Sequence, residues 1–372
     1  MLDLLIKGGR VIDPANRINE IKTIGVQNGL IVEADENAEA SQVLDAAGYT
    51  VAPGLIDGHA HIWPLTNMGV QAESACFPSG VTTAVDAGST GCATYECHRP
   101  AMLGMQVNVK ALLHVCPAGL TAFRTKVEYI DPALFDKASM HRLIRQYSGE
   151  IVGVKIRMGQ ETALDMGTAP LLAACDIAHE AGLPVVVHST RPPVSMRELI
   201  ECLGPGDIIT HPYHGHGRTI LEDGGMDALQ KARERGVYID VGDAGWHISF
   251  EVMRKALEAG LAPDSISTDI TDRGCYRRGS TFSLLHCMSK WRTLGLSMED
   301  VIRCVTQAPA QELHLNAGTL STGAVADIAI LREEPTSLVF TDGVGQQMEA
   351  GNILRAMATI RAGRLVYRDT AF

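Results

Sequence analysis

Residues 184–212 read PVVVHSTRPPVSMRELIECLGPGDIITHP, and this stretch contains the repeating unit that decides the fold class. Its two ends, PVVVHS and DIITHP, are short apolar segments typical of buried parallel strands, and the residues between them have helical periodicity. The same alternation extends in both directions along the chain. We predict eight strands, in the segments GLIDGHAHI, GVTTAVDAG, VNVKALLHV, IVGVKIRM, PVVVHS, DIITHP, VYIDVG and SISTDI.

Eight β/α units within residues 53–317 match the usual size of a closed barrel. The predicted fold class is therefore α/β, a (β/α)8 TIM barrel. A doubly wound open sheet is the alternative, but no glycine-rich phosphate loop follows the first predicted strand.

The two ends of the chain have a different texture, in which short β segments are separated by Gly, Asn and Asp. The N-terminal segments are LLIKGGRVID, IGVQNGLIVEA and GYTVA, and the C-terminal ones are ADIAILR, ILRAMATIRAG and RLVYRD. Neither end is large enough to bury a core alone. We therefore expect residues 1–52 and 318–372 to pair into one small β-sandwich domain beside the barrel of residues 53–317.

Composition excludes several classes of protein. The formal net charge of −11, without basic patches, argues against nucleic acid as a partner. No apolar run reaches the ~18 residues of a membrane span, and the start MLDLLIKGGRVIDP lacks the apolar core of a secretory signal. The nine cysteines are scattered without a C-x-x-C pair, which is typical of reduced thiols. We expect a cytoplasmic protein with no membrane partner.

Polar residues end several predicted strands, at the edge where barrel enzymes place catalytic groups. They are metal-ligand types: His59, His61, Lys155, His188, His211 and Asp269. His59 and His61 lie two residues apart in one strand, so both can face the same metal. His188 and His211 end successive strands and can reach a second metal. Taken singly, each histidine could instead be structural.

Lys155 is predicted to face the barrel interior, where an ammonium group is costly to bury. Burial lowers the pKa of a lysine, and the neutral amine can take up carbon dioxide to form N6-carboxylysine, whose two oxygens can bridge two divalent metal ions. An ion pair with an acid such as Asp86 is the alternative.

Asp269 has the position of a catalytic carboxylate. It would ligate one metal and accept a proton from a bridging water, leaving hydroxide to attack a polarised carbonyl. It would then pass the proton to the leaving group. Its alternative role is that of a helix N-cap.

These residues lie in the motifs APGLIDGHAHI, VKIR, VVVHS, ITHPYHG and ISTDI, and in this order the sequence resembles the amidohydrolase superfamily. The flanking segments DLLIKGGRVIDPAN and GTLSTGAVADIAIL are similar to the composite β domain of that superfamily. The resemblance implies two metal ions, usually Zn2+. The implied ligands are His59, His61 and Asp269 for the more buried metal, His188 and His211 for the more exposed one, and Lys155 as the bridging carbamate.

Within the superfamily, the segments VKIRMG, HPYHG and DVGDAG most resemble the deacetylase group once classed with dihydroorotases. The resemblance implies similarity to enzymes that remove acetyl groups from α-hydroxy or α-amino carboxylates. The chain departs from the expected DVGHG at Asp243, and TDRGCYRRG follows STDI where a histidine is expected directly after the aspartate. Both departures lie beside the predicted substrate pocket, so they bear on the substrate rather than on the metals.

Several residues near the ligands are candidates for substrate binding. Arg157, two residues beyond Lys155, is expected to bind a carboxylate through paired hydrogen bonds. Tyr213 and His214 could donate to the carbonyl oxygen as it gains negative charge. The arginines expected to be solvated at the rim are Arg191, Arg273, Arg277 and Arg278. Cys92 is expected to be a packing cysteine.

The expected function is that of a binuclear amidohydrolase, a deacetylase of a small N- or O-acylated carboxylate. One alternative is a cyclic amide hydrolase of the dihydroorotase or hydantoinase kind. The other is a metal-free scaffold, although all six ligand positions are filled here. A small anionic molecule is the expected partner, and self-association into a homo-oligomer is expected because barrel hydrolases are often oligomeric.

Overall fold

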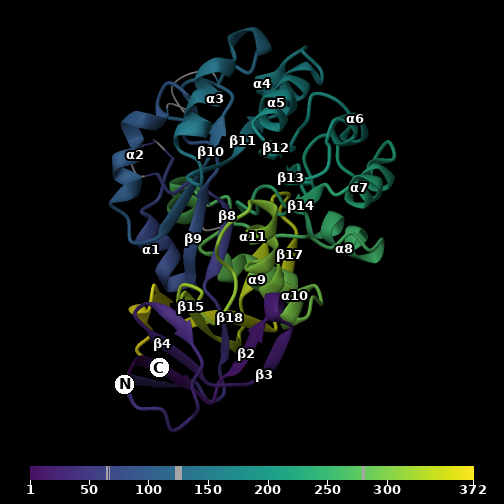
Figure 1. The fold of residues 1–372 in the computed structure, drawn as a ribbon. Helices are drawn as coiled ribbons and strands as arrows, with labels where there is room; N and C mark the ends of the chain where they lie inside the picture. Colours follow the sequence, from purple (N-terminus) through teal and green to yellow (C-terminus); the bar gives the residue numbers. More distant parts are fainter. Residues whose placement is uncertain (64–65, 67, 122–127, 279–280) are drawn as a thin grey trace.

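The computed structural model describes residues 1–63, 66, 68–121, 128–278 and 281–372. Figure 1 shows a part built of strands and helices, mostly blue, teal and green, and a β-rich part in purple and yellow. Both chain ends lie in the β-rich part (Figure 1).

The central sheet has seven parallel strands, and each one pairs with the next along the chain. Their bounds are β8 (Leu55–Ala60), β9 (Val81–Asp86), β10 (Asn108–His114), β11 (Ile151–Arg157), β12 (Val185–His188), β13 (Ile208–Thr210) and β14 (Tyr238–Asp240). These strands coincide with the first seven that the sequence predicts. Sequential parallel pairing brings all their carboxyl ends to one edge.

The eighth predicted segment, SISTDI at residues 265–270, is not a regular strand. It forms only an isolated bridge with the end of β14. The backbone N–H of Asp243 donates to Ser267 O at 3.1 Å, and that of Asp269 donates to His59 O at 2.7 Å. The segment thus joins β14 to β8, but the left-handed backbone of Asp269 (φ 46°) interrupts the ladder. The prediction of a regular eighth strand is corrected on this point.

Helices follow the strands and lie around the sheet (Figure 1). In α3, the buried Met140, Leu143 and Ile144 have the i, i+3, i+4 spacing of a helix that packs one face on a core. In α6, Ser195 and Glu198 form a capping box that starts the helix. In the described part of the chain, no helix has the length and apolarity that a bilayer crossing requires.

The helices have the following bounds. They are α1 (Ala72–Cys76), α2 (Tyr95–Leu103), α3 (Lys137–Gln146), α4 (Gln160–Ala163), α5 (Ala169–Glu180), α6 (Met196–Glu201), α7 (Gly225–Glu234), α8 (Phe250–Glu258), α9 (Leu284–Thr293), α10 (Met298–Arg303) and α11 (Gln307–Glu312). Short turns are η1 (Pro14–Asn16), η2 (Phe77–Ser79), η3 (Pro132–Leu134) and the π-helical η4 (Arg273–Arg278).

The β-rich part combines strands from both ends of the chain. One sheet has the order β19-β18-β15-β7-β2-β3, and in it β7 pairs with β15. A second sheet has the order β5-β4-β1-β6, and β16 pairs with β17. A shared apolar core includes Leu4, Val51, Ile330 and Met357. The pairing of the two ends agrees with the expected composite β region, while the domain limits stay a prediction.

The strands of the β-rich part have the following bounds. They are β1 (Leu2–Lys7), β2 (Arg10–Asp13), β3 (Ile18–Ile21), β4 (Ile24–Gln27), β5 (Leu30–Val32), β6 (Ala40–Asp45), β7 (Thr50–Pro53), β15 (Ile328–Pro335), β16 (Val339–Thr341), β17 (Gln347–Glu349), β18 (Asn352–Arg361) and β19 (Arg364–Arg368).

A cluster of buried aliphatic side chains packs among the strands of the central sheet. It is a separate buried cluster formed by Val85, Ala87, Leu112, Val152, Val186, Ile208 and Leu313. Val186 and His188 lie two residues apart in β12, so their side chains face the same side. The polar residues at the strand ends are therefore backed by packed aliphatic side chains.

Candidate metal centre

Asp269 lies at the centre of the first group of potential ligands. Its Oδ1 is 3.1 Å from His61 Nε2 and 3.5 Å from His59 Nε2. One ligand atom from each of the three residues lies within 4.8 Å of the others, and all three residues are buried. We call His59, His61 and Asp269 the buried group. It unites the three residues that the sequence assigns to the more buried metal.

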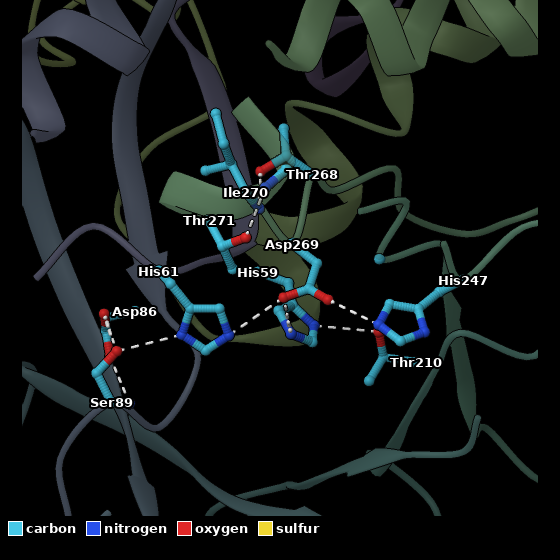
Figure 2. A network of polar contacts seen from close by, with 12 residues as sticks. His59, His61, Asp86, Ser89, Thr210, His247, Thr268, Asp269, Ile270 and Thr271 are labelled. Carbon is cyan, nitrogen blue, oxygen red and sulfur yellow. Dashed lines mark hydrogen bonds and ion pairs between the residues drawn. The ribbon is translucent and has the colours of Figure 1, made fainter. Parts of the chain in front are cut away.

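Hydrogen bonds hold the imidazole of His61 in place. Its Nδ1 lies 3.2 Å from Ser89 Oγ, and that hydroxyl donates to Asp86 Oδ2 at 2.8 Å. Since the Ser89 proton goes to Asp86, the serine oxygen can accept from Nδ1–H and leave Nε2 with a free lone pair. Figure 2 shows this chain from Asp86 to Asp269. The carboxylate of Asp86 therefore orients a histidine instead of pairing with Lys155.

His59 is held in a similar way from the opposite side. Its Nδ1 lies 3.1 Å from Thr210 Oγ1 and 3.5 Å from Asp240 Oδ2, and the Thr210 hydroxyl donates to that carboxylate at 2.7 Å. Burial lowers the pKa of His59 to about 4. The ring is therefore neutral near pH 7, as a metal ligand must be.

Lys155 lies beside the buried group, with its Nζ 3.2 Å from His59 Nε2. Burial lowers its pKa to about 8, although the charges of Asp269 and Asp240 act in the opposite direction. The chain makes room for it at Gly88, which has φ +86°, because a Cβ there would lie 2.8 Å from the Cγ of Lys155. A buried lysine with a lowered pKa fits the predicted carboxylation.

A second group of potential ligands consists of His188, His211 and His247, again with ligand atoms within 4.8 Å of one another. The centroid of the His211 ring is 4.6 Å from that of His188 and 4.2 Å from that of His247. We call these three residues the exposed group, because the side chain of His247 is 14% exposed. The sequence predicts His188 and His211 here, whereas His247 was not identified. The only available signal was a histidine shortly after the seventh strand.

His211 is directed into this group by its backbone. Its Nδ1 lies 2.7 Å from the carbonyl oxygen of Gly242, so that nitrogen carries the proton and donates. Its Nε2 is buried and has no hydrogen-bond partner among the described residues. His211 itself has a left-handed backbone (φ 69°), and a Cβ on Gly242 would lie 2.3 Å from its ring.

The donor set fits divalent metal ions. Burial lowers the pKa values of His188 and His211 well below the ordinary range, so both rings are neutral. Burial alone would raise the pKa of Asp269, but the neighbouring side chains of His247 and His61 outweigh it and hold that pKa well below its ordinary value. Neutral imidazoles, one anionic oxygen ligand and an orphaned Nε2 form the kind of set that zinc prefers.

A cavity of about 330 Å³ opens over the two groups. Arg157 lines it, as predicted, but its guanidinium pairs with Glu128 and lies 3.5 Å from Glu161 Oε1. Arg191 and Arg273 line the cavity too. The side chains of Arg277 and Arg278 lie outside the described part of the chain.

Two predicted substrate residues are not brought to this cavity. The hydroxyl of Tyr213 donates to Leu261 O at 3.0 Å, and the side chain packs in the apolar core. His214 is fully buried, and its Nδ1 accepts from the backbone N–H of His216. The left-handed His211 turns the chain away from the cavity, so neither residue is placed to donate to a substrate carbonyl. Cys92 packs in the core, as expected.

The two sequence departures lie in different surroundings. Thr271 and Arg273, after the aspartate, line the cavity as expected. Asp243 does not line it. Its carboxylate is fully buried and forms an ion pair with Lys290 at 2.7 Å. Asp243 lies beside the cavity in the chain, next to Ala244, which lines it, but its own side chain turns toward Lys290 in α9.

Comparison with known proteins identifies a matching family and several similar proteins. The model of the amidohydrolase family matches residues 50–357. A deacetylase from Brucella anthropi is 33% identical over 307 residues, which are 81% of this chain and 76% of the relative. A deacetylase from Enterococcus faecalis is 29% identical over 372 residues, 98% of each chain.

Two crystal structures have closely similar folds, each with a TM-score of 0.91. One, described as an adenine deaminase, is 28% identical and is matched over 99% of this chain and 100% of its own. The other, described as a dihydroorotase, is 27% identical and is matched over 99% of this chain and 98% of its own. These matches confirm the predicted α/β barrel class. The names of the relatives differ in the bond that is cleaved, so similarity alone does not assign a substrate.

Proposed function

This chain belongs to the amidohydrolase family, and from that premise we propose that it is a metal-dependent deacetylase of small N- or O-acylated carboxylates. The observation that carries the proposal is the position of Asp269 between the histidines of the buried group and those of the exposed group. Its Oδ1 faces His61 at 3.1 Å and its Oδ2 faces His247 at 3.2 Å (Figure 2). Two divalent ions, which we propose to be Zn2+, would supply the Lewis acidity that polarises a carbonyl and activates water.

Asp269 is the proposed proton carrier. Its carboxylate is charged, lines the cavity and is slightly accessible, so it can take a proton from the attacking water at one oxygen. The same oxygen can then return the proton to the leaving nitrogen or oxygen. We propose that Lys155, as N6-carboxylysine, would supply oxygen ligands to the metal ions held by the buried and exposed groups.

The rim of the cavity favours an anionic substrate. The chain carries a net charge of −11, yet Arg191 and Arg273 both line this one cavity. A guanidinium suits a carboxylate because its N–H groups match the two oxygens. We propose that these two arginines bind the substrate carboxylate, a role that the sequence analysis gave to Arg157.

Arg157 has a different proposed role. Its partner Glu128 also lies 2.9 Å from His114 Nε2 through its other oxygen. The three side chains form a buried chain beside Lys155, with the glutamate only 8% exposed. Arg157 would therefore shape the cavity wall through Glu128, and its loss is expected to harm charged and neutral substrates alike.

A substrate panel on the metal-loaded enzyme tests the proposal. It contains N-acetyl amino acids, O-acetyl hydroxy acids, their methyl esters, cyclic amides and adenine, with acetate, ring opening and ammonia measured separately. We expect acetate release from the acetylated acids and at least about 10-fold lower kcat/KM for the methyl esters, equal to about 1.4 kcal/mol. Ring opening without acetate release would replace the proposal by a cyclic amide hydrolase, and no turnover would favour a scaffold.

Arginine variants sharpen the test. Arg191→Met and Arg273→Met should each lower kcat/KM for acetylated acids about 10- to 100-fold and leave turnover of their methyl esters nearly unchanged. Arg254→Met is the matched control, because Arg254 lies on the exposed face of α8. Equal losses on charged and neutral substrates would contradict a role in carboxylate binding.

A further inference from the structure

The position of His247 was not expected from its place in the sequence. It follows β14 by seven residues, in the loop DVGDAGWHISF, yet its ring centroid lies 4.2 Å from that of His211 and 5.1 Å from that of His188. Its Nδ1 lies 2.8 Å from Thr190 Oγ1, and its Nε2 faces Asp269. The hydroxyl of Thr190 can accept from Nδ1–H, which leaves the Nε2 lone pair directed into the exposed group.

A tight turn brings His247 to this position. Gly242, Ala244 and Gly245 all have positive φ angles, of 53°, 43° and 65°. The backbone N–H of His247 then donates to Asp243 O at 3.0 Å, which closes the turn. Left-handed backbone at the non-glycine Ala244 is strained, so the surrounding contacts must hold it.

Asp243 is the anchor of the turn. Its Oδ1 accepts from Lys290 Nζ at 2.7 Å, from Thr281 Oγ1 at 2.8 Å and from the backbone N–H of Gly245 at 2.8 Å. Both Asp243 and Lys290 are fully buried, so this ion pair is not screened by water. Breaking a buried ion pair leaves an uncompensated charge and is strongly destabilising. This cost holds the side chain of Asp243 in place.

We infer that His247 is a third histidine ligand of the metal ion in the exposed group, presented there by the turn that Asp243 and Lys290 anchor. The inference rests on the proposed function, because it requires that the centre binds metal. Its basis is the convergence of three imidazoles, whose ligand atoms lie within 4.8 Å of one another, on a site where His211 Nε2 has no hydrogen-bond partner among the described residues. Three nitrogens leave this ion fewer open positions than two and hold it more tightly.

A role limited to the hydrogen bond with Asp269 is the competing explanation, and His247→Gln separates the two. Glutamine keeps a side-chain N–H donor but is a poor zinc ligand. The experiment measures zinc per chain and the rate of zinc loss to a chelator, using full-length protein purified with bicarbonate. Cobalt-substituted protein adds visible absorption as a readout of coordination.

We expect the wild-type protein to hold about two ions and His247→Gln to lose one of them at least about 100-fold faster, since losing even an outer partner of a ligand costs 10- to 100-fold in affinity. The cobalt spectrum should change as well. His216→Gln is the matched control, because His216 stacks on Trp246 at 3.9 Å and is not in the exposed group. It should retain both ions.

His247→Gly with added imidazole guards against a folding defect. If His247 is a ligand, added imidazole should bind in the space left by the deleted side chain, ligate the zinc ion and slow its loss. Imidazole should have no effect on a misfolded variant. If His247→Gln holds both ions as tightly as the wild type and its cobalt spectrum is unchanged, the inference is overturned and the proposed function stays intact. A wild-type protein that binds no zinc and hydrolyses nothing would overturn both.

Discussion

The buried group (His59, His61 and Asp269) and the exposed group (His188, His211 and His247) are built in different ways. In the buried group, two histidines come from one strand, β8 and the residue that follows it, and side-chain hydroxyls orient their rings. In the exposed group, the histidines come from a strand end, a left-handed residue and an anchored turn. Strand periodicity produces the buried group, whereas loop geometry completes the exposed group.

The largest expected effect comes from Lys155, because its proposed carbamate serves both groups. Lys155→Ala should remove both ions and lower kcat/KM at least about 1,000-fold, since a catalytic metal contributes several kcal/mol to transition-state stabilisation. Elemental analysis and initial rates, both with bicarbonate in the buffer, measure the two effects. Lys110→Ala is the control, because Lys110 Nζ donates to Gly149 O. Loss of one ion alone would show that Lys155 serves a single group.

Paired hydroxyl variants test whether the two groups are independent. Ser89→Ala removes the hydrogen-bond partner of His61, and Thr190→Val removes that of His247. Each should weaken one ion about 10- to 100-fold and spare the other, because second-shell partners orient ligands and raise their basicity. Chelator titration with two resolved phases measures the result. Weakening of the same phase by both variants would contradict the division into two groups.

The smallest expected effect is a change in the pH dependence of the free energy of unfolding, and it comes from Glu312. Ser265 Oγ donates to Glu312 Oε2 at 2.8 Å and lies 3.2 Å from Asp240 Oδ1. Burial, and then the charge of Asp240, raise the pKa of Glu312 well above its ordinary 4.5. The folded protein therefore binds this proton more tightly than the unfolded chain, and the free energy of unfolding falls as the pH rises above about 4.5.

Glu312→Gln should remove this contribution. The slope changes by at most about 1.4 kcal/mol per pH unit while Glu312 titrates, so the variant gains stability relative to wild type as the pH increases. Urea unfolding at pH 5, 6, 7 and 8 on matched metal-free samples measures the difference. A difference that stays constant with pH would mean that Glu312 does not titrate differently in the two states.

Much of the centre was accessible from the sequence because it follows strand order. Alternation in β8 predicted that His59 and His61 face one side, and His188 and His211 were predicted from the ends of β12 and β13. Asp269 was placed correctly beside His61, although its segment is not the regular strand that was predicted. In each case the position along the chain translates directly into a place at one edge of the sheet.

Other residues could not be placed in this way. Tyr213 directly follows Pro212 and a predicted ligand, yet it packs in the core, because the left-handed His211 redirects the chain. Arg157, at the end of β11, was expected to meet the substrate, but it pairs with Glu128, which lies 29 residues earlier in the chain. Such contacts depend on backbone turns and on residues distant in the chain.

The sequence by itself determined the barrel class, the pairing of the two chain ends and six of the seven residues that meet at the candidate metal centre, because hydrophobic periodicity and strand order are local properties. The tertiary structure alone decided that His247 joins them, that Asp243 faces α9 instead of the cavity and that Arg157 pairs with Glu128. The physical reason is the buried ion pair between Asp243 and Lys290, 47 residues apart, which stabilises a strained turn that no local pattern predicts.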